Sequence, residues 1–229
     1  MAQGQKPFLI AIGVIVLAGI AFIVMRMSSK GVSIPANPVV TTADTAGFRG
    51  YVLGAESAPI EVTEYADFQC PGCGAFATVQ FPDIKTRLID TGKIRFRYRD
   101  FPLDGAHVHA RVASHTAACA NDQGKFWEVE DGIYARQTEW SFASDAMPIM
   151  RQIVEAAGVN GGTWLECMQS AKYAGRIQAS YDEGVRVGVP STPTFLIEGR
   201  LYPGMSADRM VRLVDSLIAV KTAAPTPAP

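Results

Sequence analysis

The sequence predicts an α/β domain that carries a helical insertion and is preceded by an N-terminal transmembrane helix. Three observations support this fold class: an apolar run near the N-terminus, a strand–helix–strand pattern after it, and a strand–strand–helix pattern at the end, beyond a long helical stretch. With 48% hydrophobic residues, 19% charged residues and a formal net charge of −1, the chain is too apolar to be disordered throughout. The charge balance gives no electrostatic case for nucleic acid, and four cysteines are too few for a disulfide-dense mini-protein.

Residues 1–27 are predicted to form a membrane anchor or a signal peptide. Phe8–Met25 is an unbroken run of 18 apolar or glycine residues between Lys6 and Arg26. As a helix it spans about 27 Å, close to a hydrocarbon core of ~30 Å. A cleaved signal needs a shorter apolar region and a small-x-small site, for which Gly19-Ile20-Ala21 is a loose candidate. A buried soluble helix is the third alternative, and we expect an uncleaved anchor.

The next 21 residues, 28–48, are rich in Pro, Gly, Ser, Thr and Ala and have no helical or strand period, so we expect a linker. Residues 221–229 are expected to be a disordered, low-complexity tail. The remaining residues, 49–220, are long enough for one domain with a hydrophobic core.

The first half of this domain reads as strand, helix and strand. Ile60–Asp67 alternates as a strand does, Gly74–Asp90 has helical spacing with an expected kink at Pro82, and Lys93–Arg99 alternates strictly. The cations of the last segment fall on one face, which we expect to be solvated, and its apolar residues fall on the other.

A helical insertion is expected over about 106–187, because the strands on either side are too few to make separate sheets. After it come a strand at Pro193–Glu198, a short strand at Arg200–Tyr202 and an amphipathic helix at Ala207–Val220. The helices expected within the insertion are Arg111–Ala120, Lys125–Arg136, Ala146–Ala157, Thr163–Ala171 and Ala174–Val187.

The motif Cys70-Pro-Gly-Cys73 lies where the first strand ends and the first helix begins. Two thiols at this spacing can close a small disulfide ring, and the first sulfur lies beside the N–H groups and positive dipole end of the helix. That position favours the thiolate, which is the reactive species. A zinc site needs four ligands, and Cys119 and Cys167 each stand alone. A redox dithiol is therefore preferred over a metal site or a purely structural disulfide.

Two further features, a proline at the start of a strand and a group of histidines, have no role that the residues alone decide. Pro193, after Thr192, stands at the start of a strand, where a trans proline is tolerated. His107, His109 and His115 have no recognisable metal-ligand spacing, so we expect no metal and no bound cofactor.

Four segments together resemble the DsbA family of thioredoxin-fold disulfide oxidoreductases, and most closely its anchored, BdbD-like bacterial branch. The segments are EYADFQCPGC, IRFRYRDFPL, GKFWEVEDGIYARQ and GVPSTPTFLIEGRLYPG. The resemblance covers about 50–220 and implies a thioredoxin fold with the helical insertion.

The resemblance also implies a role for each motif residue. Cys70 would form the mixed disulfide and Cys73 would be the resolving thiol. Thr192 and Pro193 would form a cis-proline loop that faces Cys70 and pairs with an extended client segment. Glu64 would be the buried acid beneath the dithiol and relay protons, although a surface position on the strand is equally compatible with the residues.

Two departures from the family pattern bear on the redox direction. Gly72 stands where DsbA has a histidine, which removes one stabiliser of the thiolate, and Thr192 replaces a valine as in isomerase-type relatives. We expect an enzyme that introduces disulfides. The alternatives are a reductase or isomerase of the same fold, and a non-catalytic peptide-binding or chaperone module.

Cys119 and Cys167 are expected to form a structural disulfide. Four cysteines allow three pairings, and only this one leaves the short Cys70–Cys73 ring intact. Two buried free thiols are the alternative. An anchored domain in an oxidising compartment favours the disulfide.

The expected location is a bacterial cell membrane, which the N-terminal helix crosses once. The catalytic domain is expected on the extracytoplasmic side (periplasmic or outer). The expected partners are unfolded or thiol-containing client proteins and a membrane redox partner, either a quinone-linked reoxidase or an electron donor.

Overall fold

The computed structural model describes residues 12–13, 15–17, 19 and 32–223. The chain divides into two units, Met1–Ser33 and Ile34–Pro229. The predicted anchor over 1–27 therefore lies largely outside the described residues, of which 12–13, 15–17 and 19 are helical. Among the described residues, no helix is both long and apolar enough to cross a membrane. Residues 224–229 of the predicted tail also lie outside them.

The second unit is built on a five-stranded sheet of order β1-β3-β2-β4-β5. The parallel pair β2 and β3 forms its centre, and every other neighbouring pair is antiparallel. The strands are β1 (Tyr51–Leu53), β2 (Ile60–Ala66), β3 (Ile94–Asp100), β4 (Thr194–Ile197) and β5 (Arg200–Pro203). The three residues of β1 were not predicted, because a strand so short carries no measurable alternation.

Alternation along β2 sends its side chains to two different layers. Ile60, Val62 and Glu64 point to the face covered by the helix that follows β2 and by α11 (Ala207–Ala223), where a hydrophobic core cluster lies. Thr63 and Tyr65 point to the opposite face, which α10 (Ala174–Val187) covers. Glu64 is thus placed on the apolar side of the sheet.

The helix after β2 begins at Pro71 and runs to Ile89, as α3 (Pro71–Ala75), η1 (Phe76–Gln80), α4 (Phe81–Ile84) and η2 (Lys85–Ile89). It starts three residues before the predicted Gly74, so Pro71 occupies the first helical position, where its missing N–H costs nothing. Around Pro82 the turns widen: the Phe81 N–H donates to the carbonyl of Phe76, five residues earlier.

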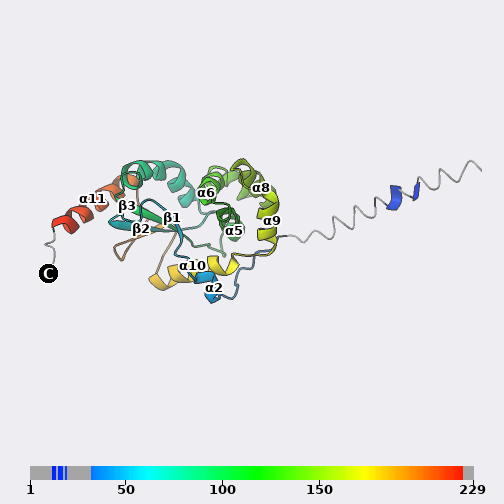
Figure 1. The fold of residues 1–229 in the computed structure, drawn as a ribbon, viewed down its shortest axis with the longest axis horizontal. Helices are drawn as coiled ribbons and strands as arrows, with labels where there is room; N and C mark the ends of the chain where they lie inside the picture. Colours follow the sequence, from blue (N-terminus) through cyan, green and yellow to red (C-terminus); the bar gives the residue numbers. More distant parts are fainter. Residues whose placement is uncertain (1–11, 14, 18, 20–31, 224–229) are drawn as a thin grey trace, which may run out of the picture. The chain divides into compact units, whose positions relative to one another are not determined.

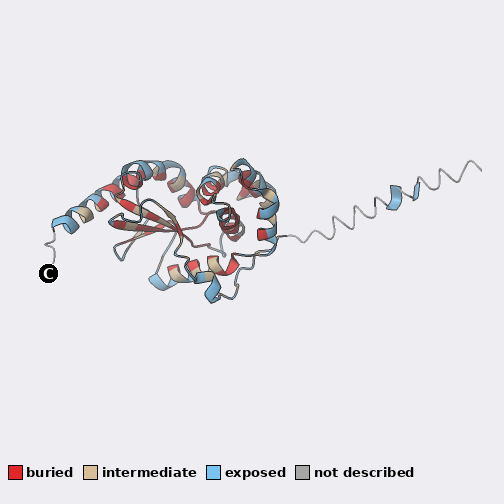
Figure 2. Ribbon diagram, viewed as in Figure 1, coloured by how far each residue is buried: buried red, intermediate tan, exposed pale blue. Residues whose placement is uncertain are grey.

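The predicted helical insertion is confirmed. It contains α5 (Ala110–Asn121), α6 (Phe126–Ala135), α7 (Gln137–Trp140), α8 (Met147–Ala156) and α9 (Gly161–Gln169). These helices lie together beside one end of the sheet, whereas α10 lies along the sheet (Figure 1). Their inward faces are buried and their outer faces exposed (Figure 2).

The cationic face of β3 is covered, so the expectation that it is solvated is wrong. The Arg97 and Arg99 side chains are 12% and 5% exposed. Arg99 Nη2 lies 2.5 Å from the Glu183 carboxylate of α10, and Arg97 Nε lies 3.2 Å from that of Glu61 on β2. These acids neutralise the arginines and allow a helix to cover them.

Part of the predicted linker is ordered structure. Residues 34–48 belong to the second unit, where α2 (Thr42–Thr45) packs on α10. Asp44 caps the helix through Thr41, and the Arg176 guanidinium lies 4.3 Å from the centre of the Phe48 ring. At the other end, α11 continues to Ala223, three residues past the predicted end.

A disulfide joins Cys119 of α5 to Cys167 of α9, with 5.9 Å between the two Cα atoms. It links two helices of the insertion across 48 residues of chain. The bond restricts the unfolded chain and so favours the folded one.

Replacing both cysteines of this bridge by alanine is expected to lower the free energy of unfolding by about 4 kcal/mol, since a loop of this length is released. Urea unfolding measures the effect. The comparison is made in a Cys70→Ala/Cys73→Ala background, so that the redox state of the other pair does not contribute. An unfolding free energy that stays within about 1 kcal/mol of the parent would contradict this role.

Candidate active site

The loop between β2 and α3 fixes Cys70 at the start of a helix. The Cys70 N–H donates to the carbonyl of Asp67, and the Cys70 carbonyl accepts the first helical bond from the Gly74 N–H at 3.1 Å. The buried Asp67 carboxylate accepts from the N–H groups of Gln69 and Leu103, both at 2.7 Å. The chain is therefore held on both sides of Cys70.

A cis peptide bond between Thr192 and Pro193 places a second loop against the Cys70 sulfur. The Cys70 sulfur lies 3.3 Å from the Thr192 carbonyl oxygen, to which it donates a hydrogen bond when it is protonated. The two segments are 122 residues apart in sequence. The antiparallel pairing of β2 with β4 brings them together at the same end of the sheet, where β2 ends and β4 begins.

The two cysteines of the pair have opposite environments. Cys70 is 9% exposed and Cys73 is fully buried. The hydrogen bond from the Cys73 thiol lowers the pKa of Cys70 to about 5, helped by the Thr192 hydroxyl and the N–H groups of Gly72 and Cys73 against the effect of burial. Burial raises the pKa of Cys73 well above its ordinary value, and the Cys70 hydrogen bond and the Glu64 charge raise it further. At neutral pH the first sulfur is a thiolate and the second a thiol.

Glu64 lies beneath the dithiol and is 4% exposed. Burial, followed by the charge of Cys70, raises the pKa of its carboxyl group to about 8. The sequence allowed Glu64 to be either buried beneath the dithiol or exposed on the strand, and in the structure it is buried.

Three polar residues of this region escaped sequence reasoning. Gln137 of α7 donates through Nε2 to the carbonyls of Phe68 and Cys70, at 2.7 Å and 2.9 Å, and so braces the loop. Glu130 of α6 is 4% exposed and lies near enough to Glu64 for their charges to interact. Tyr134, one turn further along α6, lies 3.4 Å from the Tyr98 hydroxyl. Only the helical periodicity of α6, which puts Glu130 on the same face as the apolar Phe126, hints at burial.

Two pockets adjoin the Cys70–Cys73 turn, one including Pro71 and the other Gly72 in its lining. One of about 390 Å³ is mostly apolar and is lined by Gly72, Phe76, Val79, Pro193 and Met205, among others. The other, of about 370 Å³, includes Gln69, Pro71, His107, Gln137 and the exposed Phe142.

The histidines near the site have protein partners. His107 Nδ1 lies 2.7 Å from Asp67 Oδ2, and His109 Nε2 lies 2.8 Å from the carbonyl oxygen of Ala143. Among the described residues, the metal-ligating side chains that come together are His115, Cys119 and Cys167, whose two sulfurs are joined in the disulfide.

A family model described as thioredoxin matches residues 48–216. The chain belongs to the thioredoxin family. This membership confirms two predictions from the sequence motifs: the resemblance to thioredoxin-fold disulfide oxidoreductases and the mixed α/β thioredoxin-like fold.

The chain is similar to part of an antiporter and to most of a disulfide bond formation protein. A Na(+)/H(+) antiporter NhaA 3 of Salinispora tropica is 33% identical over 156 residues, which are 68% of this chain and 22% of the antiporter. A probable disulfide bond formation protein D of Bacillus anthracis is 26% identical over 153 residues, or 65% of this chain and 70% of that protein. The chain thus spans about a fifth of the length of the antiporter that it matches.

Among solved structures, the crystal structure of DsbA from Chlamydia trachomatis is similar, with a TM-score of 0.69 and 18% identity. The match covers 82% of this chain and 98% of that chain. At this identity the likeness supports the fold.

The Thr192 hydroxyl is expected to set part of the Cys70 pKa. Thr192→Val should raise that pKa from about 5 by about one pH unit, because the buried hydroxyl that favours the thiolate is removed. The ultraviolet absorbance of the thiolate, followed against pH, measures it. Thr192→Ser keeps a hydroxyl and is the matched control; equal pKa values in the valine and serine variants would contradict the assignment.

Glu64→Gln is expected to raise the free energy of unfolding of the reduced protein at pH 7 by about 3 kcal/mol. Folded Glu64, with its pKa raised to about 8 from 4.5, keeps a proton that the unfolded chain releases, so this contribution to stability is lost as pH rises from 4.5 to 8. Urea unfolding of both proteins at pH 4 and pH 8 tests the sign. A difference between them that does not grow with pH would show that Glu64 titrates normally.

Proposed function

We propose that this chain is a protein thiol–disulfide oxidoreductase that introduces disulfides into extracytoplasmic client proteins through Cys70 and Cys73. One observation carries the proposal: a thiolate that keeps 9% of its residue's surface exposed and a fully buried thiol lie at the start of one helix beside a cis-proline loop. In thiol–disulfide exchange the thiolate is the attacking and leaving species, so an asymmetric pair gives each sulfur a separate task.

In the oxidising direction, a client thiolate attacks Sγ of Cys70 in the Cys70–Cys73 disulfide. The bond between the two sulfurs breaks, and Cys73 leaves with the electron pair and takes up a proton. A second client thiolate then attacks the client sulfur of the mixed disulfide, and Cys70 leaves as a stable thiolate. The client has lost two electrons and gained a disulfide, and the dithiol has gained both electrons.

The low pKa of Cys70 supports this direction. Whatever stabilises the thiolate stabilises the reduced form, and a pair with a stable reduced form is a strong oxidant. A glycine at position 72 in place of a histidine reduces the stabilisation of the thiolate but does not remove it, because the Cys73 thiol and the N–H groups of Gly72 and Cys73 still donate hydrogen bonds to the Cys70 sulfur.

Client binding would use the cis-proline loop and the apolar pocket beside it. An extended client segment that pairs with the backbone near Thr192 would bring its sulfur to the Thr192 carbonyl, 3.3 Å from the Cys70 sulfur. Phe76 and Met205 of the adjoining pocket suit an apolar side chain of an unfolded protein. Unfolded or thiol-containing proteins are therefore the proposed clients.

The proposed location of the catalytic domain is the extracytoplasmic side of a bacterial membrane, with residues 1–27 as the anchor. The disulfide between Cys119 and Cys167 supports an oxidising compartment. A cycle of this kind needs a partner that removes two electrons from the dithiol, and a quinone-linked membrane protein is the proposed reoxidase.

The reduction potential of the Cys70–Cys73 pair tests the direction. We expect a value between about −200 and −120 mV from equilibration with glutathione, the range that runs from weaker oxidants to DsbA. A value near or below about −270 mV, which is typical of thioredoxin, would favour a reductase and contradict the oxidase.

Catalysis itself is tested by replacing the reactive sulfur. Cys70→Ser should lower the rate at which the oxidised protein forms a disulfide in a reduced client peptide by at least about 100-fold, since no mixed disulfide can form at this position. A Cys119→Ala/Cys167→Ala variant, which keeps the dithiol, is the control. Oxidation that survives in Cys70→Ser would indicate a peptide-binding module without turnover.

A further inference from the structure

The fully buried Cys73 must exchange a proton each time the disulfide opens or closes. A client covers Cys70 during the first exchange step, and the Cys73 sulfur has no surface exposure of its own. Glu64 beside it is also buried, so this acid alone does not connect Cys73 to solvent. A route for the proton has to continue past Glu64.

A second buried acid, Glu130, lies near enough to Glu64 for their charges to interact. Glu130 and Tyr134 are one turn apart on α6, so they share a helix face. Tyr134 interacts with the charges of Cys73, Glu64 and Glu130, and its hydroxyl lies 3.4 Å from that of Tyr98. Residues from α3, β2, β3 and α6 thus form one buried polar cluster: Cys73, Glu64, Tyr98, Tyr134 and Glu130.

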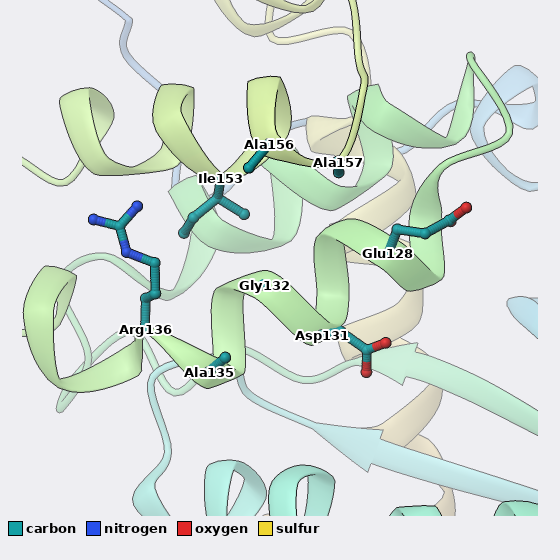
Figure 3. Close-up of a pocket in the computed structure, with 8 residues that line it drawn as sticks. All are labelled: Glu128, Asp131, Gly132, Ala135, Arg136, Ile153, Ala156 and Ala157. Atoms are coloured by element: carbon teal, nitrogen blue, oxygen red, sulfur yellow. The ribbon is translucent and has the colours of Figure 1, made fainter.

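Glu130 reaches the surface through its neighbour in sequence. Its carboxyl group is hydrogen-bonded to that of Asp131, and its Oε2 atom has no hydrogen-bond partner in the described protein. Asp131 is exposed and lines a pocket of about 480 Å³ between α6 and α8. Figure 3 shows Asp131 and Glu128 on α6, with Ile153 and Ala156 on the neighbouring helix.

This pocket is distinct from the two pockets beside the dithiol. It shares no lining residue with either pocket that flanks the dithiol. A proton that passes through it would not compete with a bound client.

We propose that Glu130 relays protons between Glu64 and Asp131, so that Cys73 exchanges its proton with solvent through the insertion helix α6. The proposal rests on the proposed function and deepens it. When client attack breaks the disulfide, the Cys73 thiolate takes the proton of Glu64; Glu64 takes that of Glu130; and Glu130 takes one from solvent through Asp131. Reoxidation of the dithiol runs the same transfers backwards, and no electron moves along the path.

The protonation states fit this sequence. Burial raises the pKa of Glu130 well above its ordinary value, and the charges of Asp131 and Glu64 raise it further, which favours the protonated form of this acid. Glu64, with a pKa of about 8, holds a proton at neutral pH. Asp131, whose pKa is raised less, accepts the hydrogen bond of Glu130 at the surface. Glu130 acts through Glu64 and is a positioning residue.

The test is single-turnover oxidation of a reduced client peptide by the oxidised full-length protein, measured between pH 5 and pH 9. Glu130→Gln keeps the shape and the neutral charge but cannot relay a proton. It should slow the reaction about tenfold at pH 7 and increase the slowing in deuterated water. Imidazole buffer should restore part of the rate by supplying a small proton donor at the pocket. The reduction potential should not change, because a neutral group replaces a neutral group.

Two further variants keep the test decisive. Glu155→Gln, which replaces an exposed acid of α8 outside the proposed path, should behave as wild type. Asp131→Asn, at the exposed end, should show a smaller slowing of the same kind even if Glu130→Gln is unstable. A Glu130→Gln variant that matches wild type in rate, pH profile and isotope effect would overturn the relay. If wild type and Cys70→Ser oxidise the peptide equally slowly, the proposed function fails instead.

Discussion

The hydrogen bond from the Cys73 thiol to the Cys70 sulfur is the interaction on which the rest of the site depends. It makes one sulfur of the pair a thiolate and ties the second to its proton. The geometry needs Cys70 at the first turn of a helix, with Cys73 one turn below it. Everything else around the dithiol either holds that turn in place or preserves the difference in burial between the two sulfurs.

The fold supplies both conditions from distant parts of the chain. Asp67 and Gln137 hold the loop that presents Cys70, and the cis bond before Pro193 brings the Thr192 carbonyl to its sulfur. The sheet puts Glu64 beneath the helix because alternation along β2 turns it toward the apolar layer. The insertion then closes over this layer with α6, so a buried acid remains next to a buried thiol. Burying the Glu64 carboxylate would be costly, but its protonation removes the charge and so reduces this loss of stability.

Sequence patterns predicted most of this architecture, and their failures have physical causes. The Cys70–Cys73 motif lies at the boundary of a strand and a helix, which local residue types determine well. The two faces of β3 were also predicted, but the alternation could not tell that Glu183, 84 residues after Arg99, would cover the cationic face. The burial of Glu130 was not predicted for the same reason. The segment Glu-Val-Glu-Asp is typical of a solvated helix turn, and Glu130 is buried only because α6 packs near the dithiol.

The central claim is that Cys70 alone of this pair is the reactive sulfur, and alkylation of the reduced protein at pH 6 tests it most directly. A brief exposure to iodoacetamide followed by peptide mapping measures how much label each cysteine carries. The account predicts label on Cys70 and almost none on Cys73, because only the pKa of Cys70 lies below this pH. Equal labelling of the two cysteines, or preferential labelling of Cys73, would contradict it.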